Sequence, residues 1–242
     1  MFTKKLIVLL SVFVVNAFAA DKITAQSWLV ATESGRIIHG ANIDKQRSIA
    51  SITKLMTAMI VIDAGQNPQE KIGNYTREQH IQLALVNSNN QSAILLCENY
   101  PGGKTRCIRD MNLKAASIGM KNTKFVEASG LSPMNISTGR DLLELVLSAS
   151  YYPQIREAGK TPQVKIQIRK KLFFFNNTNP SIGKQHEFIV SKTGWTKAAG
   201  GCIVMYLKTE VGNRVVIVLG SKNTKTRIPE AEFISTMKEI TY

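Results

Sequence analysis

The chain alternates between strand-like ends and a helical middle. Near its start, 27–32 and 36–40 flank the turn Glu33-Ser34-Gly35, a pattern typical of a β-hairpin. Val211-Gly212-Asn213 predicts a second hairpin turn between two apolar runs near the end. Strands are expected in that part at 165–175, 187–192, 201–210 and 215–221.

The middle of the chain, about 76–152, has apolar residues at helical spacing, interrupted by clusters of Gly, Pro and Asn. Helices are expected there at 76–86, 91–99, 108–117 and 140–150. A closing helix is expected at 229–240, with Pro229 near its first turn.

The segment 51–64 is apolar around nearly its whole circumference, and Gly65 ends it. Such a helix is usually central and buried. With strands at both ends of the chain, this predicts an α/β (α+β) fold, in which helices flank an antiparallel sheet and a mostly helical insertion lies beside it at about 76–152. A site is expected in the cleft between the two parts.

The first residues have the features of a secretory signal peptide. Lys4 and Lys5 precede an apolar run at 6–15, and Ala17-Phe18-Ala19 forms an A-x-A cleavage site. We therefore expect a signal peptide at 1–19, cleaved near Ala19, and one exported domain at 20–242. No later run is apolar enough for a stable membrane anchor.

Three cysteines follow the expected cleavage point. Cys97 and Cys107 are close enough in sequence to pair across a short turn, whereas Cys202 lies in an apolar run typical of a buried strand. The odd count leaves at least one free thiol. No Cys/His spacing resembles a metal site, and the three scattered histidines are expected to be structural. No metal and no cofactor are expected.

The chain is strongly basic, with 31 Lys and Arg against 17 Asp and Glu and a formal net charge of +14. This balance favours polyanionic partners. Anionic polymers of a cell envelope fit it as well as nucleic acid, and a solvated basic surface without a partner fits it too. The chain has no nucleic-acid-binding motif, so nucleic acid is not an expected partner.

Three short signatures occur in order. They are S-x-x-K at Ser51–Lys54, S-x-N at Ser88–Asn90 and K-T-G at Lys192–Gly194. Each is weak alone, because other copies occur: S-x-x-K at Ser181–Lys184 and Ser235–Lys238, and S-x-N at Ser221–Asn223. Context separates them, since only Ser51 opens a buried helix and only the K-T-G run is expected to end a core strand.

The spacing of Ser51 and Lys54 indicates chemistry. Residues i and i+3 share one helix face, so the Lys54 amine can reach the Ser51 hydroxyl. A serine nucleophile needs a base, and a buried lysine beside a second cation has a lowered pKa. We expect Lys192 to be that cation. Such a site performs Ser-Lys catalysis without histidine.

Further roles follow from this arrangement. The N–H groups of Ser51 and Trp195 are candidate oxyanion-hole donors. Lys192 and Thr193 would bind a peptide carboxylate, next to Gly194. Ser88 would relay a proton to the leaving amine, and Asn90 would hold a substrate amide. The structural alternatives are a helix N-cap for Ser51, turn residues for Ser88 and Asn90, and a plain strand end for the K-T-G run.

The trio in this order is the signature of penicillin-binding proteins and class A β-lactamases. The chain resembles the D-Ala-D-Ala carboxypeptidases and endopeptidases among the low-molecular-mass penicillin-binding proteins, and it is most similar to the endopeptidase branch. The resemblance is carried by Ala50–Met59, Tyr100–Gly103, Ala116–Met120, Asn122–Glu127, Ser129–Leu131, Asn135 and Ser191–Gly200.

The resemblance implies a penicilloyl-serine-transferase fold and an acyl-enzyme on Ser51. It implies peptidoglycan stem peptides as substrates in the periplasm and β-lactams as covalent inhibitors. The motif residues carry over as Ser51, Lys54, Ser88, Asn90, Lys192, Thr193 and Gly194. The chain departs from the family in a shorter segment from 65 to 88, and in having Asn89 at the middle of its second signature.

Two alternatives are kept open. A class A-like β-lactamase needs a glutamate that anchors a water, and the stretch after Glu127 lacks the expected pattern. The other alternative is a secreted binding module whose site is degenerate, and the intact Ser51, Lys54 and Lys192 argue against it.

Overall fold

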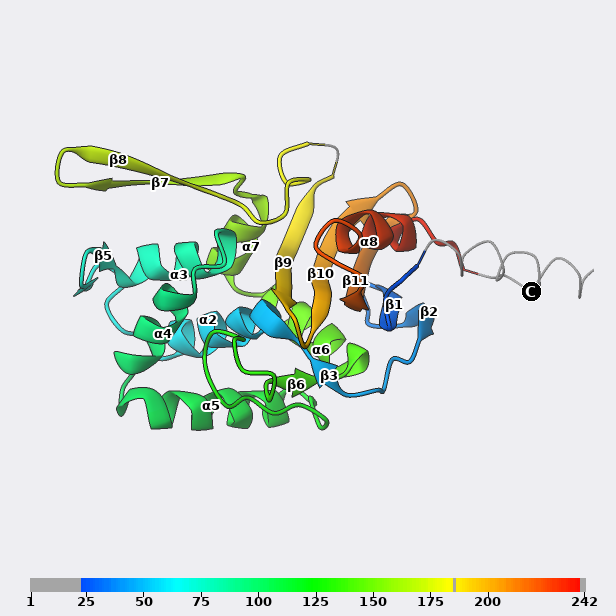
Figure 1. Cartoon of the computed structure of the whole chain (residues 1–242), viewed down its shortest axis with the longest axis horizontal. Coiled ribbons are helices and arrows are strands. Elements are labelled where there is room, and N and C mark those ends of the chain that lie inside the picture. The colour runs from blue at the N-terminus through cyan, green and yellow to red at the C-terminus, as the bar shows by residue number, and fades with distance from the viewer. Residues whose placement is uncertain (1–22, 185, 240–242) are drawn as a thin grey trace, which may run out of the picture.

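The computed structural model describes residues 23–184 and 186–239, and the predicted signal peptide at 1–19 lies outside them. Its centre is one antiparallel sheet in the order β2-β1-β11-β10-β9. The prediction of an antiparallel sheet built from both ends of the chain is confirmed (Figure 1). The strands are β1 (Ser27–Thr32), β2 (Ile37–Ala41), β9 (Phe188–Thr196), β10 (Gly200–Thr209) and β11 (Gly212–Ser221).

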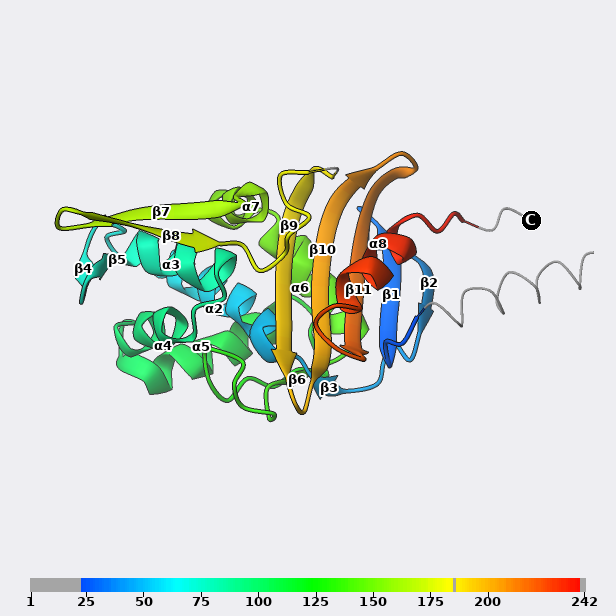
Figure 2. The ribbon, with the colours of Figure 1, turned by 45° about the horizontal axis from the view of Figure 1, so that its top comes forward.

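Both faces of this sheet are covered, which explains its continuous apolar strands. Alternate residues of a strand point to opposite faces. Val216 and Val218 pack with α8 (Arg227–Ser235), whereas Val215 and Ile217 belong to the main core with α6 (Gly139–Ala149). Figure 2 shows α8 in front of the sheet and α6 behind it.

The helix after Ser51 is buried, as predicted. Helix α2 (Thr53–Asp63) has every residue from Thr53 to Val61 buried, because four other helices pack around it. Those helices are α3 (Arg77–Val86), α4 (Asn90–Glu98), α5 (Gly103–Ser117) and α6. Helix α6, which the sequence analysis assigned to the helical insertion, also packs against β1, β10 and β11.

The disulfide Cys97–Cys107 joins α4 to α5, which realises the pairing that the spacing allowed. Cys202 is free and fully buried in β10. Burial raises the pKa of its thiol to about 11, so the reactive thiolate is scarce at neutral pH.

Two strand predictions were wrong. The apolar run at 165–175 is a hairpin, formed by β7 (Gln163–Ile168) and β8 (Lys171–Asn176). Its turn places Arg169 at φ +54°, and no Gly or Asn marks that turn in the sequence. The K-T-G run does not end a strand, because β9 continues to Thr196 in register with β10.

Several short elements were not predicted. Helix α7 (Pro153–Lys160) packs against α3 and β9. Two short antiparallel pairs also occur: β3 (Arg47–Ser48) with β6 (Ile136–Ser137), and β4 (Lys71–Ile72) with β5 (Tyr75–Thr76).

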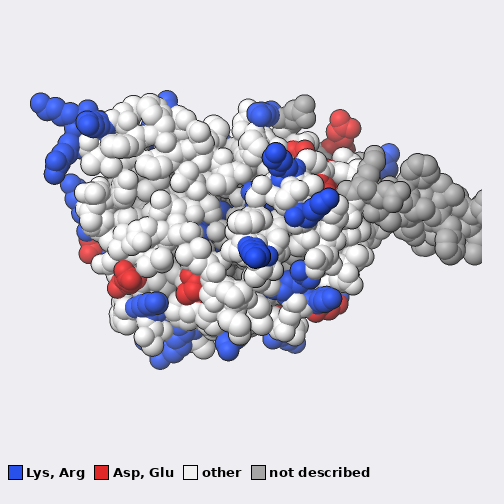
Figure 3. All heavy atoms as spheres, viewed as in Figure 1, with Lys and Arg blue, Asp and Glu red and all other residues white. Residues whose placement is uncertain are grey.

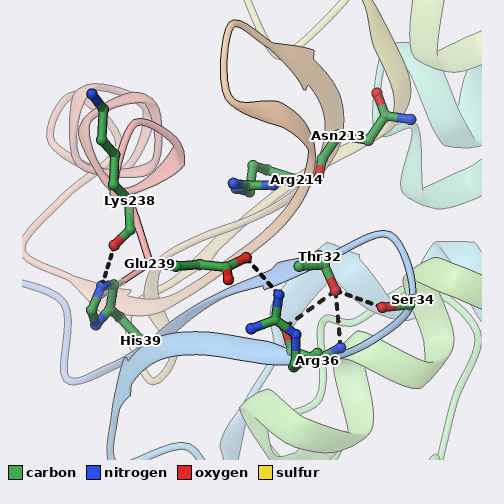
Figure 4. Close-up of polar contacts among 8 residues, drawn as sticks. All are labelled: Thr32, Ser34, Arg36, His39, Asn213, Arg214, Lys238 and Glu239. Carbon is green, nitrogen blue, oxygen red and sulfur yellow. Dashed lines mark hydrogen bonds and ion pairs between the residues drawn. The ribbon is translucent and has the colours of Figure 1, made fainter. Parts of the chain in front are cut away.

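The segment after α8 returns to the first hairpin. Arg36 forms an ion pair of 2.6 Å with Glu239, and the His39 ring contacts the Lys238 carbonyl at 2.8 Å (Figure 4). The predicted closing helix extended to 240, but α8 ends at Ser235, and the following residues make these contacts instead.

Candidate active site

Ser51 lies in a single 3-10 turn, η1 (Ala50–Ile52), directly before α2. Ala50 has φ +47°, a left-handed conformation that costs energy for a residue with a Cβ. Gly130 packs on this turn, and a Cβ added to it would lie 2.0 Å from the Ala50 carbonyl oxygen. Backbone strain of this kind is frequent at functional sites, where the surrounding structure holds it in place.

Lys54 is completely buried beneath Ser51. Its Nζ lies 2.8 Å from Ser51 Oγ and 2.8 Å from Asn90 Oδ1, and it also donates to the Ser129 carbonyl. A neutral amine has two N–H donors and one lone pair. The amide and carbonyl oxygens can only accept, so they take the two donors, and the lone pair is left for the Ser51 hydroxyl proton.

The protonation of Lys54 suits this geometry. Burial lowers its pKa from 10.5 to about 7, although the Glu127 carboxylate nearby acts in the opposite direction. A large share of the amine is therefore uncharged at neutral pH, and a base is most effective when its pKa is close to the working pH.

Strand β9 forms the other wall of the site. It is an edge strand, and it packs against η1. A Cβ added to Gly194 would be 3.0 Å from the Ser51 backbone nitrogen, so the absence of a side chain permits this close approach. Thr193 donates from Oγ1 to Thr178 Oγ1 at 2.6 Å, and Trp195 is exposed.

Lys192 is also buried, and its Nζ donates to the Thr193 carbonyl at 3.0 Å. Its pKa is lowered well below the ordinary value, first by burial and then by the charges of Lys54 and Arg227. The sequence predicts that burial and the charge of Lys192 together lower the pKa of Lys54. Burial does lower it, but the repulsion lowers the pKa of Lys192 and not that of Lys54, because two ammonium groups in one dry site are not both favoured.

The three residues of the S-x-N signature have different roles. Ser88 has φ +58° in the loop between α3 and α4, and among the described residues its hydroxyl makes no hydrogen bond. Asn89 caps α4 by accepting from the Ser92 N–H at 2.8 Å. Asn90 is thereby directed toward Lys54. Lys54 thus contacts both Ser51 and Asn90, whereas Ser88 forms no side-chain hydrogen bond within the described part of the chain.

The loop at 127–135 holds the backbone of the site in position, although the sequence did not predict this. Glu127 accepts from the N–H groups of Ser129 and Gly130 at 2.7 and 2.6 Å, and from Asn135 Nδ2 at 2.7 Å. These bonds hold in place the Ser129 carbonyl oxygen, which accepts a hydrogen bond from Lys54 Nζ. The run Ser129-Gly130-Leu131 indicates the family, but nothing in it predicts that the Ser129 carbonyl accepts a hydrogen bond from Lys54.

Two further residues had no signal in the sequence. Thr178, which follows β8, accepts a hydrogen bond from the Thr193 hydroxyl. Arg227, at the start of α8, donates to the Gly194 carbonyl at 2.6 Å and is nearly buried. Both become neighbours of β9 only through the tertiary fold.

The histidines lie elsewhere. His80 is buried, with its ring nitrogens next to Ser92 Oγ and the Ile72 carbonyl, which is a structural role. Within 23–184 and 186–239, no group of three or more His, Cys, Asp or Glu could hold a metal ion. A cavity of about 650 Å³ lies between α3, α7 and β7, and none of the candidate residues lines it.

Glu127→Gln should move the pH dependence of acylation at Ser51. The carboxylate favours the charged form of Lys54, so its removal lowers the pKa of Lys54 further. The rising limb of the acylation rate, measured with a fluorescent penicillin against pH, is expected to shift to lower pH. Glu98→Gln, on an exposed position of α4, should leave the midpoint unchanged. An unchanged or higher midpoint in Glu127→Gln would show that this charge does not act on Lys54.

Two known endopeptidases are similar to this chain in sequence. The chain is 36% identical over 209 residues to a D-alanyl-D-alanine endopeptidase of Pseudomonas aeruginosa, covering 76% of this chain and 67% of the relative. It is 35% identical over 242 residues to a D-alanyl-D-alanine endopeptidase of Escherichia coli, covering 89% and 77%.

Solved structures share the fold. The Streptomyces K15 DD-transpeptidase, as a single-residue variant, superposes with a TM-score of 0.81 at 23% identity, covering 88% of this chain and 96% of that one. Penicillin-binding protein D2 of Listeria monocytogenes, in its ampicillin-bound form, superposes with a TM-score of 0.78 at 25% identity and the same coverage. The predicted fold class is confirmed.

The sequence also matches the profile of one peptidase family over residues 14–72 and 66–223, which is most of the chain. The predicted family is therefore confirmed, and the chain belongs to peptidase family S11, the D-alanyl-D-alanine carboxypeptidases.

Proposed function

We propose that this serine peptidase cleaves D-Ala-containing stem peptides of peptidoglycan through an acyl-enzyme on Ser51. One observation carries the proposal: the Ser51 hydroxyl lies 2.8 Å from a buried amine whose pKa is about 7. A serine with such a base is an activated nucleophile. The curated relatives in Pseudomonas and Escherichia are named as endopeptidases for the D-alanyl-D-alanine bond.

In acylation, Lys54 takes the Ser51 proton while Oγ attacks the carbonyl carbon of the D-Ala residue. The N–H groups of Ser51 and Trp195 are the proposed donors to the oxyanion. The C–N bond then breaks, the leaving amine receives the proton through Lys54 and Ser88, and the acyl group stays on Ser51 as an ester. Water hydrolyses the ester by the reverse proton transfers, with Lys54 again as the base.

The proposed substrate path follows β9. The free edge of this strand can pair with an extended peptide, as edge strands do in peptide recognition. Lys192 and Thr193 would bind the terminal carboxylate next to Gly194, and a carboxylate beside Lys192 would favour its charged form. Asn90 uses Oδ1 for Lys54, so its Nδ2 group is the part that would hold a substrate carbonyl.

A β-lactamase activity fits the site less well. Glu127 would be the residue to position a hydrolytic water, but its two oxygens accept bonds from Ser129, Gly130 and Asn135. This carboxylate organises a loop. We therefore expect penicillins to remain bound to Ser51 and to clear slowly, as covalent inhibitors of the enzyme.

We place the enzyme in the periplasm on the strength of the predicted signal peptide at 1–19 and the relatives it resembles. Within the described part of the chain, no helix combines the length and apolarity that crossing a bilayer requires.

Mass spectrometry of purified muropeptides after digestion tests the function. A carboxypeptidase removes one terminal D-Ala, whereas an endopeptidase splits cross-linked dimers into monomers, and the masses of these products differ. Ser51→Ala is the control and should give neither product. If the folded wild-type enzyme changed no muropeptide mass, the proposed activity would be wrong.

A further inference from the structure

The hairpin of β7 and β8 projects from the rest of the molecule. In Figures 1 and 2 it extends over α3, and its tip is the leftmost point of the drawn body. The two strands pair only with each other, in a separate two-stranded sheet. The inner side of the hairpin lies on α3, and Phe175 contacts Tyr75 of β5 edge-on, with ring centres 6.5 Å apart.

The outer part of this hairpin is apolar and exposed. Leu172, Phe173 and Phe174 expose 52%, 41% and 55% of their surface. They are three of the eight large hydrophobic side chains that the described residues expose. Leu172 and Phe174 share one face of β8, whereas Phe173 lies on the other face, opposite Ile166. Single exposed apolar residues are ordinary, whereas neighbours on one face, here Leu172 and Phe174, form a patch of the kind that marks an interaction site.

Positive charge surrounds this apolar group. The hairpin carries Lys165, Arg169, Lys170 and Lys171, and no Asp or Glu occurs in the sequence between Glu157 and Glu187. Among the described residues, none of the seven ion pairs involves these four cations. Figure 3 shows Lys and Arg side chains gathered at the upper left, where the hairpin ends.

The apolar and basic groups share one surface. Lys165 pairs with Phe174 across the hairpin, and its Nζ lies 5.9 Å from the centre of that ring. Leu172 and Phe174 are on the same outer face of β8, next to the basic tip, because alternate residues of a strand share a face. A partner at this tip therefore meets anion-binding groups and bulky apolar side chains together.

We infer that the β7–β8 hairpin is a peripheral docking element for an anionic phospholipid surface. Lys and Arg near such a surface are attracted to its acidic headgroups. Phe and Leu side chains insert into the boundary between headgroups and acyl chains. A polyanionic polymer would bind the cations but would leave Leu172 without an apolar partner. A lipid surface would contact both the cations and the apolar side chains. A projecting tip can also reach a flat surface without obstruction from the body.

Flotation of the full chain with lipid vesicles tests this. One set of vesicles is pure phosphatidylcholine, and the other also contains phosphatidylglycerol. We expect binding to the anionic vesicles only. The variants Lys170→Glu/Lys171→Glu and Leu172→Ser/Phe174→Ser should each lower the bound-to-free ratio by at least about tenfold, since each removes one of the two attractions.

Matched changes elsewhere serve as controls. Lys222→Glu/Lys225→Glu has the same charge change at exposed positions before α8, and Leu113→Ser removes an exposed apolar side chain from α5. Both should stay within about twofold of the wild type if the hairpin makes the contact. Retained penicillin labelling of all variants shows that they are folded, independently of vesicle binding.

Four outcomes would overturn the inference. The first is the absence of binding to anionic vesicles, and the second is an equal loss in the Lys222/Lys225 control, which would indicate net charge alone. The third is that only the lysine variant loses binding while the chain binds heparin equally well, which would indicate a polyanion. A dimer in sedimentation that Leu172→Ser/Phe174→Ser dissolves would assign the apolar group to a second copy instead.

Discussion

Replacement of Lys54 by methionine is expected to lower the rate of penicillin acylation at Ser51 by about 10²- to 10⁴-fold, the usual contribution of a positioned general base. Methionine keeps the apolar volume of the buried stem and removes the amine 2.8 Å from Ser51 Oγ. Stopped-flow acylation with a fluorescent penicillin measures the rate. Thermal unfolding of the same variant shows whether the fold is kept.

The pKa of the same Lys54 amine also determines how the acylation rate of the wild type depends on pH. Its pKa is lowered to about 7, so below that pH the protonated form dominates and cannot accept the Ser51 proton. The acylation rate should therefore rise through about pH 7 and then level off. A folded Lys54→Met variant that acylates within about threefold of the wild-type rate would remove Lys54 as the base.

Gly130→Ala is the second change with a large expected effect. A Cβ there would lie 2.0 Å from the Ala50 carbonyl oxygen, and Gly130 has φ +85°. The turn carrying Ser51 must move, or the loop carrying the Ser129 carbonyl must move away from Lys54. We expect acylation to fall at least about 100-fold, because displacements near 1 Å in an active site have effects of this size.

Gly119→Ala is the matched control for that change. Gly119 has nearly the same backbone angle, φ +87°, but an added Cβ meets nothing within 4 Å. It should cost about 1–2 kcal/mol of unfolding free energy from the left-handed backbone alone and leave the acylation rate unchanged. If both alanine variants acylated at the same rate, the contact between Gly130 and the Ser51 turn would not matter for catalysis.

Much of the fold was predictable because local patterns agreed with the tertiary structure. The segment after Ser51 is apolar on all sides, and it is buried on all sides. The first hairpin and the strands β10 and β11 were predicted within a few residues. The sequence of the β7–β8 hairpin predicts one continuous strand, because its turn at Arg169 lacks the Gly or Asn that usually marks such a conformation.

The candidate site was predictable only where spacing fixes geometry. Ser51 and Lys54 are neighbours on one turn of backbone, so sequence alone brings them together. The approach of Gly194 to the Ser51 nitrogen depends on how β9 lies against η1, which no local pattern encodes. The role of Glu127 was missed for the same reason, since its partners are loop N–H groups that the fold places around it.

The nucleophile itself can be located by peptide mapping of the penicillin-labelled enzyme. Mass spectrometry should find the penicilloyl group on the peptide that contains Ser51, and labelling should disappear in Ser51→Ala. Ser181→Ala and Ser235→Ala, which alter the other two S-x-x-K copies, should label like the wild type. A penicilloyl group on a different serine, or full labelling of the Ser51→Ala variant, would contradict the assignment of this site.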